Sequence, residues 1–91
     1  MEILNMRFIG AEEKNSADNI YVGRGSRWGN PYIIGRDGNR KEVIELYKIW
    51  LEINLNDDPD FLEPLRYKKG FICYCAPLDC HANVLANFLE R

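Results

Sequence analysis

The sequence predicts a small α/β sandwich, a single domain over residues 1–91 with three to four strands and two main helices packed on them. Short segments rich in β-branched and aromatic residues alternate with longer segments whose apolar residues recur every three to four positions. The chain has 91 residues, of which 46% are hydrophobic and 29% charged. That length and composition suit one soluble domain with a single modest core.

The first part of the chain predicts strands joined by polar connections. Residues 2–9 predict a first strand, and residues 20–22 predict a second. The polar residues 10–19 between them predict a surface loop. Residues 32–34 predict a short additional strand, which a turn over residues 35–38 closes.

A long helix is the clearest element of the middle of the chain. Asn39 followed by Glu42 is typical of a capping box. Apolar residues then recur at helical spacing from Val43 to Leu51, which predicts a helix over residues 40–54.

The last third predicts a short helical turn, a buried strand and a final helix. Asp58 and Pro59 predict the N-cap and first residue of the turn. Residues 71–75 predict the strand, and Asp79 is expected to cap the final helix. The apolar face of that helix consists of Val84, Leu85, Phe88 and Leu89.

Composition narrows the class of protein. Twelve Lys and Arg against fourteen Asp and Glu give a net charge of −2, which argues against a large nucleic-acid surface. No apolar run reaches the roughly 18 residues of a membrane helix, and no secretory signal is recognisable, so a cytoplasmic location without membrane contact is expected. Three cysteines within eight residues predict reduced thiols rather than a disulfide framework.

A glycine-rich loop over residues 22–32 is the first candidate site. Glycines let the backbone approach a ligand, and Arg24 and Arg27 can hold a phosphate, while Trp28 or Tyr32 can stack on a base and Asn30 can read a polar edge. The alternative is a turn-rich connection in which Trp28 fills the core and the arginines form surface ion pairs. The candidate ligand-binding residues of this loop are Arg24, Gly25, Ser26, Arg27, Trp28, Asn30 and Tyr32.

A cysteine- and histidine-containing segment over residues 73–85 is the second candidate site, and three interpretations remain open. Cys73, Cys75, Cys80 and His81 have the ligand types of a structural zinc site, although their spacing is unusually tight. Cys80 at a helix start is a candidate catalytic nucleophile, with His81 as a candidate base. Alternatively, Cys73 and Cys75 are small buried hydrophobic residues. In each case, backbone amides near Cys80 and His81 can meet a phosphate.

Both segments carry a family resemblance. The run from Val22 to Tyr32, the helix with Tyr47 and Trp50, and the run from Cys73 to Leu85 together resemble the bacterial and phage family called domain of unknown function 4326. The resemblance extends over residues 20–88 and implies the fold of that family. It also implies that one site contains Arg24, Ser26, Arg27, Trp28, Asn30, Cys75, Cys80 and His81.

Two positions depart from the pattern of that family. Tyr74 stands where the family usually has Trp, and Asn83 stands where it often has an acidic residue. If that acid were catalytic in relatives, Asn83 would weaken the case for catalysis here.

The sequence supports three functional hypotheses. The leading one is a cytoplasmic binding protein for a small anionic, nucleotide-derived or phosphorylated-sugar ligand. Such a protein could act as a phage sponge that sequesters a nucleotide immune signal, as a homo-oligomer and without a cofactor. The alternative is a nucleotide- or nucleoside-processing enzyme, an N-glycosidase or phosphohydrolase that uses Cys80 or His81. The third is a structural zinc module.

Overall fold

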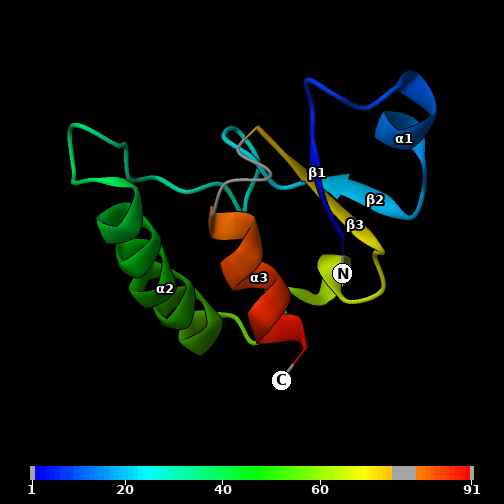
Figure 1. Ribbon diagram of the computed structural model, residues 1–91. Helices are drawn as coiled ribbons and strands as arrows, with labels where there is room; N and C mark the ends of the chain where they lie inside the picture. The colour runs from blue at the N-terminus through cyan, green and yellow to red at the C-terminus, as the bar shows by residue number, and fades with distance from the viewer. Residues whose placement is uncertain (1, 75–79, 91) are drawn as a thin grey trace.

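A small parallel sheet lies at one side of the molecule in the computed structural model, which describes residues 2–74 and 80–90 (Figure 1). Its strand order is β1-β3-β2, and both edge strands pair in parallel with the central one. The strands are β1 (Glu2–Asn5), β2 (Asn19–Tyr21) and β3 (Gly70–Cys73). Because parallel strands need crossover connections, helical segments join them and cover the sheet.

Two main helices lie side by side on one face of the sheet, with α3 between α2 and the strands (Figure 1). The predicted α/β architecture, with three to four strands and two main helices, is thus confirmed with a sheet of three strands in the described part of the chain, and shorter helical segments are present in addition. The helices are α1 (Ala11–Asn15), α2 (Arg40–Asp57) and α3 (His81–Leu89), with a 3₁₀ turn, η1 (Glu63–Leu65). No helix in the described part of the chain is long and apolar enough to cross a membrane.

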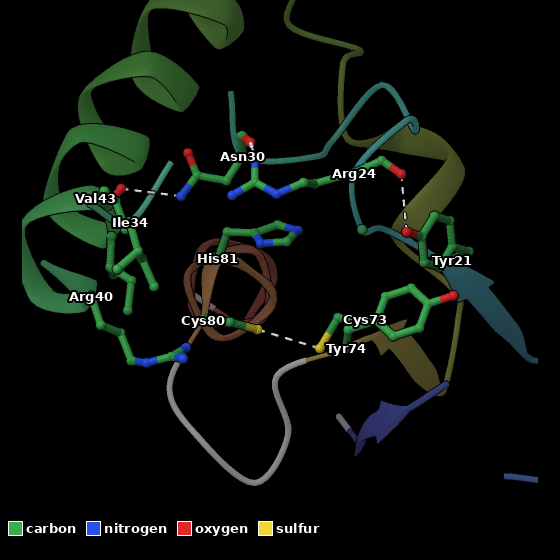
Figure 2. Close-up of a pocket in the computed structure, with 12 residues that line it drawn as sticks. Tyr21, Arg24, Asn30, Ile34, Arg40, Val43, Cys73, Tyr74, Cys80 and His81 are labelled. Atoms are coloured by element: carbon green, nitrogen blue, oxygen red, sulfur yellow. Dashed lines mark hydrogen bonds between the residues drawn. The ribbon is translucent and has the colours of Figure 1, made fainter. Parts of the chain in front are cut away.

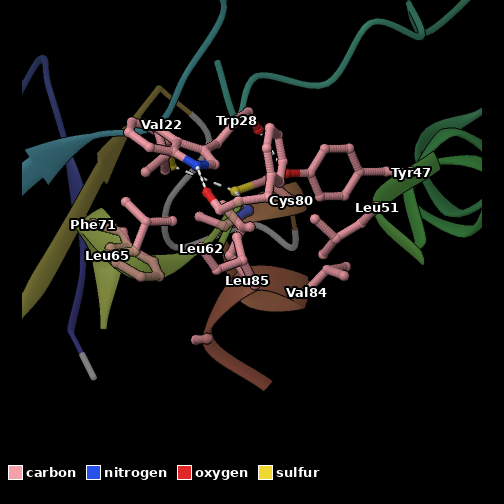
Figure 3. Close-up of a cluster of buried hydrophobic side chains, with 14 residues drawn as sticks. Val22, Trp28, Tyr47, Leu51, Leu62, Leu65, Phe71, Cys80, Val84 and Leu85 are labelled. Carbon is pink, nitrogen blue, oxygen red and sulfur yellow. Dashed lines mark hydrogen bonds between the residues drawn. The ribbon is translucent and has the colours of Figure 1, made fainter. Parts of the chain in front are cut away.

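The core fills the space between the sheet and these helices (Figure 3). Phe71 of β3 is fully buried and pairs in register with Ile3 and Ile20, so the three side chains point to the same face. Tyr47 and Leu51 are four residues apart on α2 and lie on its buried face. Burial of each large apolar side chain stabilises the fold by about 1.5–3 kcal/mol. The predicted apolar face of α3 is confirmed by Val84 and Leu85, which are buried, and by Phe88 and Leu89, which pack against the cluster.

The capping box predicted for the long helix is present. The Asn39 side chain accepts from the Glu42 amide at 2.9 Å, and the Glu42 side chain accepts from the Asn39 amide at 3.0 Å. The helix extends three residues beyond the predicted end, to Asp57, because the polar residues after Leu55 still continue its backbone hydrogen bonding. Asp58 is therefore the C-cap of α2, and it also has its predicted role at the start of the following turn. Its side chain accepts from the Asp60 amide at 3.1 Å, and its carbonyl oxygen accepts from the Phe61 amide at 3.0 Å.

The first part of the chain is less extended than predicted. The first strand ends at Asn5, whose side chain accepts from the Arg7 amide and turns the chain. Within the predicted loop 10–19, α1 forms a short, wholly exposed helix that no apolar periodicity reveals. Residues 32–34 form no strand, because Asp37 accepts from the Ile33 amide at 2.8 Å and closes a tight loop. A single bridge between Ile34 and Gly38 remains.

The last strand and helix also begin and end at other residues than predicted. β3 covers Gly70–Cys73 rather than residues 71–75, and Cys75 lies outside the described residues. The N-cap of α3 is Cys80, not Asp79, and its sulfur accepts from the Ala82 amide at 3.4 Å. Thiols cap helices less often than carboxylates, so the sequence pointed to the neighbouring aspartate.

Candidate functional site

A pocket of about 290 Å³ lies where β2 and β3 end and α2 and α3 begin (Figure 2). In parallel α/β sheets, ligands bind beyond the carboxyl ends of the strands, where the amino ends of the following helices also point. Figure 2 shows Ile34 and Arg40 on the α2 side, Tyr21 and Tyr74 on the sheet side, and His81 between them. The lining residues are Tyr21, Gly23, Arg24, Asn30, Ile34, Arg40, Val43, Ile44, Cys73, Tyr74, Cys80 and His81.

The glycines of the loop 22–32 set its backbone path. Gly25 has φ +92°, a left-handed conformation that favours glycine. A Cβ at Gly29 would lie 2.6 Å from the carbonyl oxygen of Gly23, so only glycine permits this close approach. The loop therefore folds back on itself at the rim of the pocket.

Arg24 reaches across this loop from the pocket side. Its guanidinium donates to the carbonyl oxygens of Asn30 at 2.6 Å and Tyr32 at 3.0 Å. These two bonds leave further N–H groups of the guanidinium for a ligand. Arg24 thus both closes the loop and carries positive charge at the pocket.

Asn30 lines the pocket, but its side chain forms hydrogen bonds with other parts of the protein. Its amide donates to the carbonyl of Val43 at 3.1 Å, and its carbonyl oxygen accepts from the Tyr32 amide at 2.9 Å. These bonds attach the loop to the first turn of α2. Asn30 therefore positions the pocket wall.

Trp28 belongs to the core and does not line the pocket. Its ring is buried, and its Nε1 donates to the Phe61 carbonyl at 2.9 Å. Tyr47 donates to the Trp28 carbonyl at 2.6 Å, and burial raises the pKa of Tyr47, which keeps the phenol protonated as a donor. The structure places Trp28 where the turn-rich alternative expected it, away from any base in the pocket.

Arg27 also points away from the pocket. Its guanidinium lies 3.8 Å from the Asp58 carboxylate and over the rings of Trp28 and Phe61, and its side chain is 57% exposed. The two arginines predicted to act together are thus separated by the fold.

The remaining predicted loop residues, Gly25, Ser26 and Tyr32, contribute to the backbone structure of the loop. Ser26 donates to the Gly23 carbonyl at 2.7 Å, and Tyr32 contributes only backbone groups to the bonds described above. Gly25, Ser26 and Tyr32 are not among the residues that line the pocket.

His81 is the first residue of α3 and is held at the base of the pocket. Its Nε2 lies 2.6 Å from the Val22 carbonyl, which can only accept, so Nε2 carries the proton and Nδ1 presents a lone pair. No other described residue bonds to this ring, and no buried polar side-chain atom in that part of the chain lacks a partner, so Nδ1 faces the pocket. Burial lowers the pKa of His81, and nearby Arg24 lowers it further, against the bond to Val22. His81 is therefore a neutral hydrogen-bond acceptor near pH 7.

The two described cysteines are free thiols that share a hydrogen bond with each other. The sulfurs of Cys73 and Cys80 lie 3.4 Å apart, both buried at the pocket wall. Across residues 2–74 and 80–90, no three His, Cys, Asp or Glu side chains are grouped to hold a metal. The zinc set is thus not assembled by Cys73, Cys80 and His81, and its fourth member, Cys75, lies outside the described residues.

Asn83 has a structural role at the start of α3. Its side-chain oxygen accepts from the Cys80 amide at 3.0 Å, which completes a capping box with the Cys80 sulfur. An acidic residue could make the same bond. The departure at this position therefore does not by itself remove a catalytic group.

Besides Gly23 of the loop, six pocket residues were not proposed from the sequence as site residues. No sequence motif marks them. Their position in the fold does, since they flank the ends of β2 and β3 or lie in the loop before α2 and in its first turns, where ligands bind in parallel sheets. These residues are Tyr21, Ile34, Arg40, Val43, Ile44 and Tyr74.

The fold and the pocket together define a parallel α/β domain with a pocket at the carboxyl edge of its sheet. The chain belongs to the family described as domain of unknown function 4326, whose model matches residues 9–91. Comparison with curated proteins finds no match, and neither does comparison with solved structures. The function therefore has to come from the site itself.

Proposed function

We propose that the protein binds a small anionic ligand of the nucleotide or phosphorylated-sugar class in this pocket. The observation that carries the proposal is the combination of apolar walls with positive charge in one cavity. Arg24 and Arg40 lie among the described residues that line it, and no carboxylate does. An anion gains more there than at the surface, because the enclosed site screens charge less than water.

The walls suit a flat or ring-shaped group. The rings of Tyr21 and Tyr74 meet edge to face, 6.2 Å apart, and Ile34 and Ile44 contribute aliphatic surface. The Tyr21 hydroxyl is fixed by its bond to the Arg24 carbonyl, 2.9 Å away. A pocket of about 290 Å³ lies near the lower end of ligand-site volumes, which favours one nucleoside-sized group.

His81 supports the same ligand class. Its pocket-facing Nδ1 accepts a hydrogen bond, and sugar hydroxyls or base N–H groups can donate one. The bond to Val22 fixes the ring orientation before the ligand arrives. Such preorganisation lowers the entropic cost of binding.

The test is calorimetric titration with adenosine and guanosine 5′-monophosphates. We expect saturable binding by the wild-type protein and its loss in Ile34→Trp, which fills the pocket from its rim. Ile33→Trp is the matched control, since Ile33 is similarly exposed but is absent from the pocket lining. Failure of both nucleotides to bind, or equal binding by Ile34→Trp, would contradict the proposal.

A second candidate, the nucleotide-processing enzyme, is favoured by one observation. A neutral histidine with a lowered pKa and an open Nδ1 suits a general base. Incubation of each nucleotide with substoichiometric protein, followed by mass spectrometry, separates the two functions. A binder returns the nucleotide unchanged, whereas multiple turnovers that disappear in His81→Gln or Cys80→Ser identify an enzyme.

A further inference from the structure

A second cavity, of about 560 Å³, lies between the first half of α2 and α3 and adjoins the pocket. The two cavities share Arg40, Ile44 and Cys80 in their walls. A ligand seated in the pocket can therefore extend into this second cavity, which we call the basic groove. Its lining residues are Arg40, Lys41, Ile44, Glu45, Lys48, Cys80, Asn83, Val84 and Asn87.

Among the described residues, the side chains that line the basic groove carry a net positive charge. Three cationic side chains line it against a single carboxylate, that of Glu45. Glu45 already pairs with Lys48 at 3.1 Å, and both side chains are about half exposed. Lys41 has no carboxylate partner among the described residues, so its charge is directed to solvent or to a bound anion.

The cations are spaced along the groove. Lys41 and Lys48 are seven residues apart on α2, which places them two helical turns, or about 10 Å, apart on one face. Arg40 lies at the end of this row that joins the pocket. A single compact anion cannot contact the whole row, but a chain of linked phosphates can.

The facing wall adds neutral donors. Asn83 uses its side-chain oxygen to accept from the Cys80 amide, which leaves its NH₂ group as the donor. Asn87 is one turn further along α3 and also lines the groove. Both helices begin at this end of the molecule, so the positive ends of their dipoles also favour an anion there (Figure 1).

We infer that the basic groove binds the phosphate chain of a ligand whose ring or sugar occupies the pocket. The ligand class is thereby narrowed to nucleoside diphosphates, triphosphates or other ligands with two or more linked phosphates. This inference rests on the proposed function, which supplies the pocket-bound part of the ligand.

The experiment is a calorimetric series with adenosine, AMP, ADP and ATP, run in parallel with the guanosine series. We expect the affinity of the wild-type protein to rise at least tenfold from nucleoside to diphosphate and to fall with added salt. The double variant Lys41→Gln/Lys48→Gln should lose this gain and keep its affinity for the nucleoside. The matched control is Lys14→Gln/Lys69→Gln, which changes the net charge equally at two exposed positions outside both cavities.

Inorganic pyrophosphate separates failure of the groove from failure of the pocket. It should bind Ile34→Trp as well as wild type and bind Lys41→Gln/Lys48→Gln at least tenfold more weakly. Equal wild-type affinity for nucleoside and diphosphate would overturn the groove and leave the pocket proposal standing. Pyrophosphate binding that the two double variants weaken equally would also overturn the groove, and absence of nucleoside and nucleotide binding altogether would overturn both proposals.

Discussion

The glycine-rich loop, residues 22–32, and the basic groove use their polar groups in opposite ways. In the loop, the side chains of Arg24, Trp28 and Asn30 all donate to backbone carbonyls. In the groove, Lys48 pairs with Glu45 and Asn83 accepts from the Cys80 amide, but the side chains of Lys41 and Asn87 have no hydrogen-bond partner among the described residues. The loop uses these side chains to hold its own backbone in place, whereas the side chains of Lys41 and Asn87 in the groove form no such bond with the described residues.

This difference teaches where to look for function in a small α/β domain. A segment with many glycines and buried hydrogen-bond donors indicates a tightly folded loop, because each buried polar group needs a hydrogen-bond partner. The charges that face a ligand come from an ordinary helix face and need no motif. Arg24 is a cation that does both, since it closes the loop and lines the pocket.

The largest effect should follow from Trp28→Ala, which tests whether the loop is mainly architectural. Removal of a buried Trp leaves a cavity and frees the Phe61 carbonyl, so we expect a loss of about 3–5 kcal/mol in the free energy of unfolding. Trp28→Phe keeps most of the ring and should cost about 1–3 kcal/mol through the lost hydrogen bond. Denaturant titration measures both, and a loss below about 1 kcal/mol for Trp28→Ala would remove Trp28 from the core.

The fold could be predicted where local chemistry acts within a few residues. The capping box of Asn39 and Glu42 and the apolar periodicity that follows are local, and both are confirmed. The added strand at residues 32–34 failed because Asp37 accepts from the Ile33 amide, a bond that competes with strand pairing. The short α1 has no buried face, so its sequence shows no apolar periodicity from which a helix could be predicted.

The site was predicted in part, and the reason is spatial. Arg24, Asn30, Cys80 and His81 come together at the pocket as the two motifs implied. Arg27 does not, because its guanidinium lies near Asp58 and over the Phe61 ring, and it is not among the residues that line the pocket. Pocket residues outside the motifs become recognisable only once the strands are known to be parallel.

The second-largest effect concerns Arg24, where the two regions meet. If the proposed function holds, Arg24→Ala should weaken nucleotide binding by about 1.5–3 kcal/mol, or roughly ten- to hundredfold. Arg24→Lys should recover only part of this loss, because an ammonium cannot span the carbonyls of Asn30 and Tyr32 as the guanidinium does. Calorimetric titration at low salt gives these affinities, and unchanged binding in Arg24→Ala would place the anion elsewhere.

A smaller effect should appear as a pH dependence of stability. Burial lowers the pKa of His81 in the folded state, so the unfolded state, with a pKa of about 6.5, takes up a proton first as the pH falls. The contribution of neutral His81 to the free energy of unfolding is therefore fully present above about pH 6.5. Below that pH the free energy of unfolding falls, by at most about 1.4 kcal/mol per pH unit.

His81 is the only histidine in the chain, so this slope can be assigned to it. Denaturant unfolding between about pH 5.5 and 7.5 measures it, above the range in which ordinary carboxylates titrate. His81→Gln should remove the slope. A wild-type protein that is more stable at pH 5.5 than at pH 7.5 would contradict a buried neutral histidine.

The smallest effect should come from Arg27→Ala, and it sharpens the contrast with Arg24. Arg27 forms an exposed ion pair with Asp58 at 3.8 Å and covers the Phe61 ring, and exposed pairs of this kind contribute at most about 1 kcal/mol. The free energy of unfolding should therefore change by less than about 1 kcal/mol. Nucleotide affinity should stay within about twofold of wild type, because the Arg27 side chain points away from the pocket and is not among the residues that line it. Calorimetric titration of Arg27→Ala beside Arg24→Ala makes the comparison direct, since both variants remove one positive charge from the same loop. Equal weakening in the two variants would mean that the ligand senses only the overall charge of the loop.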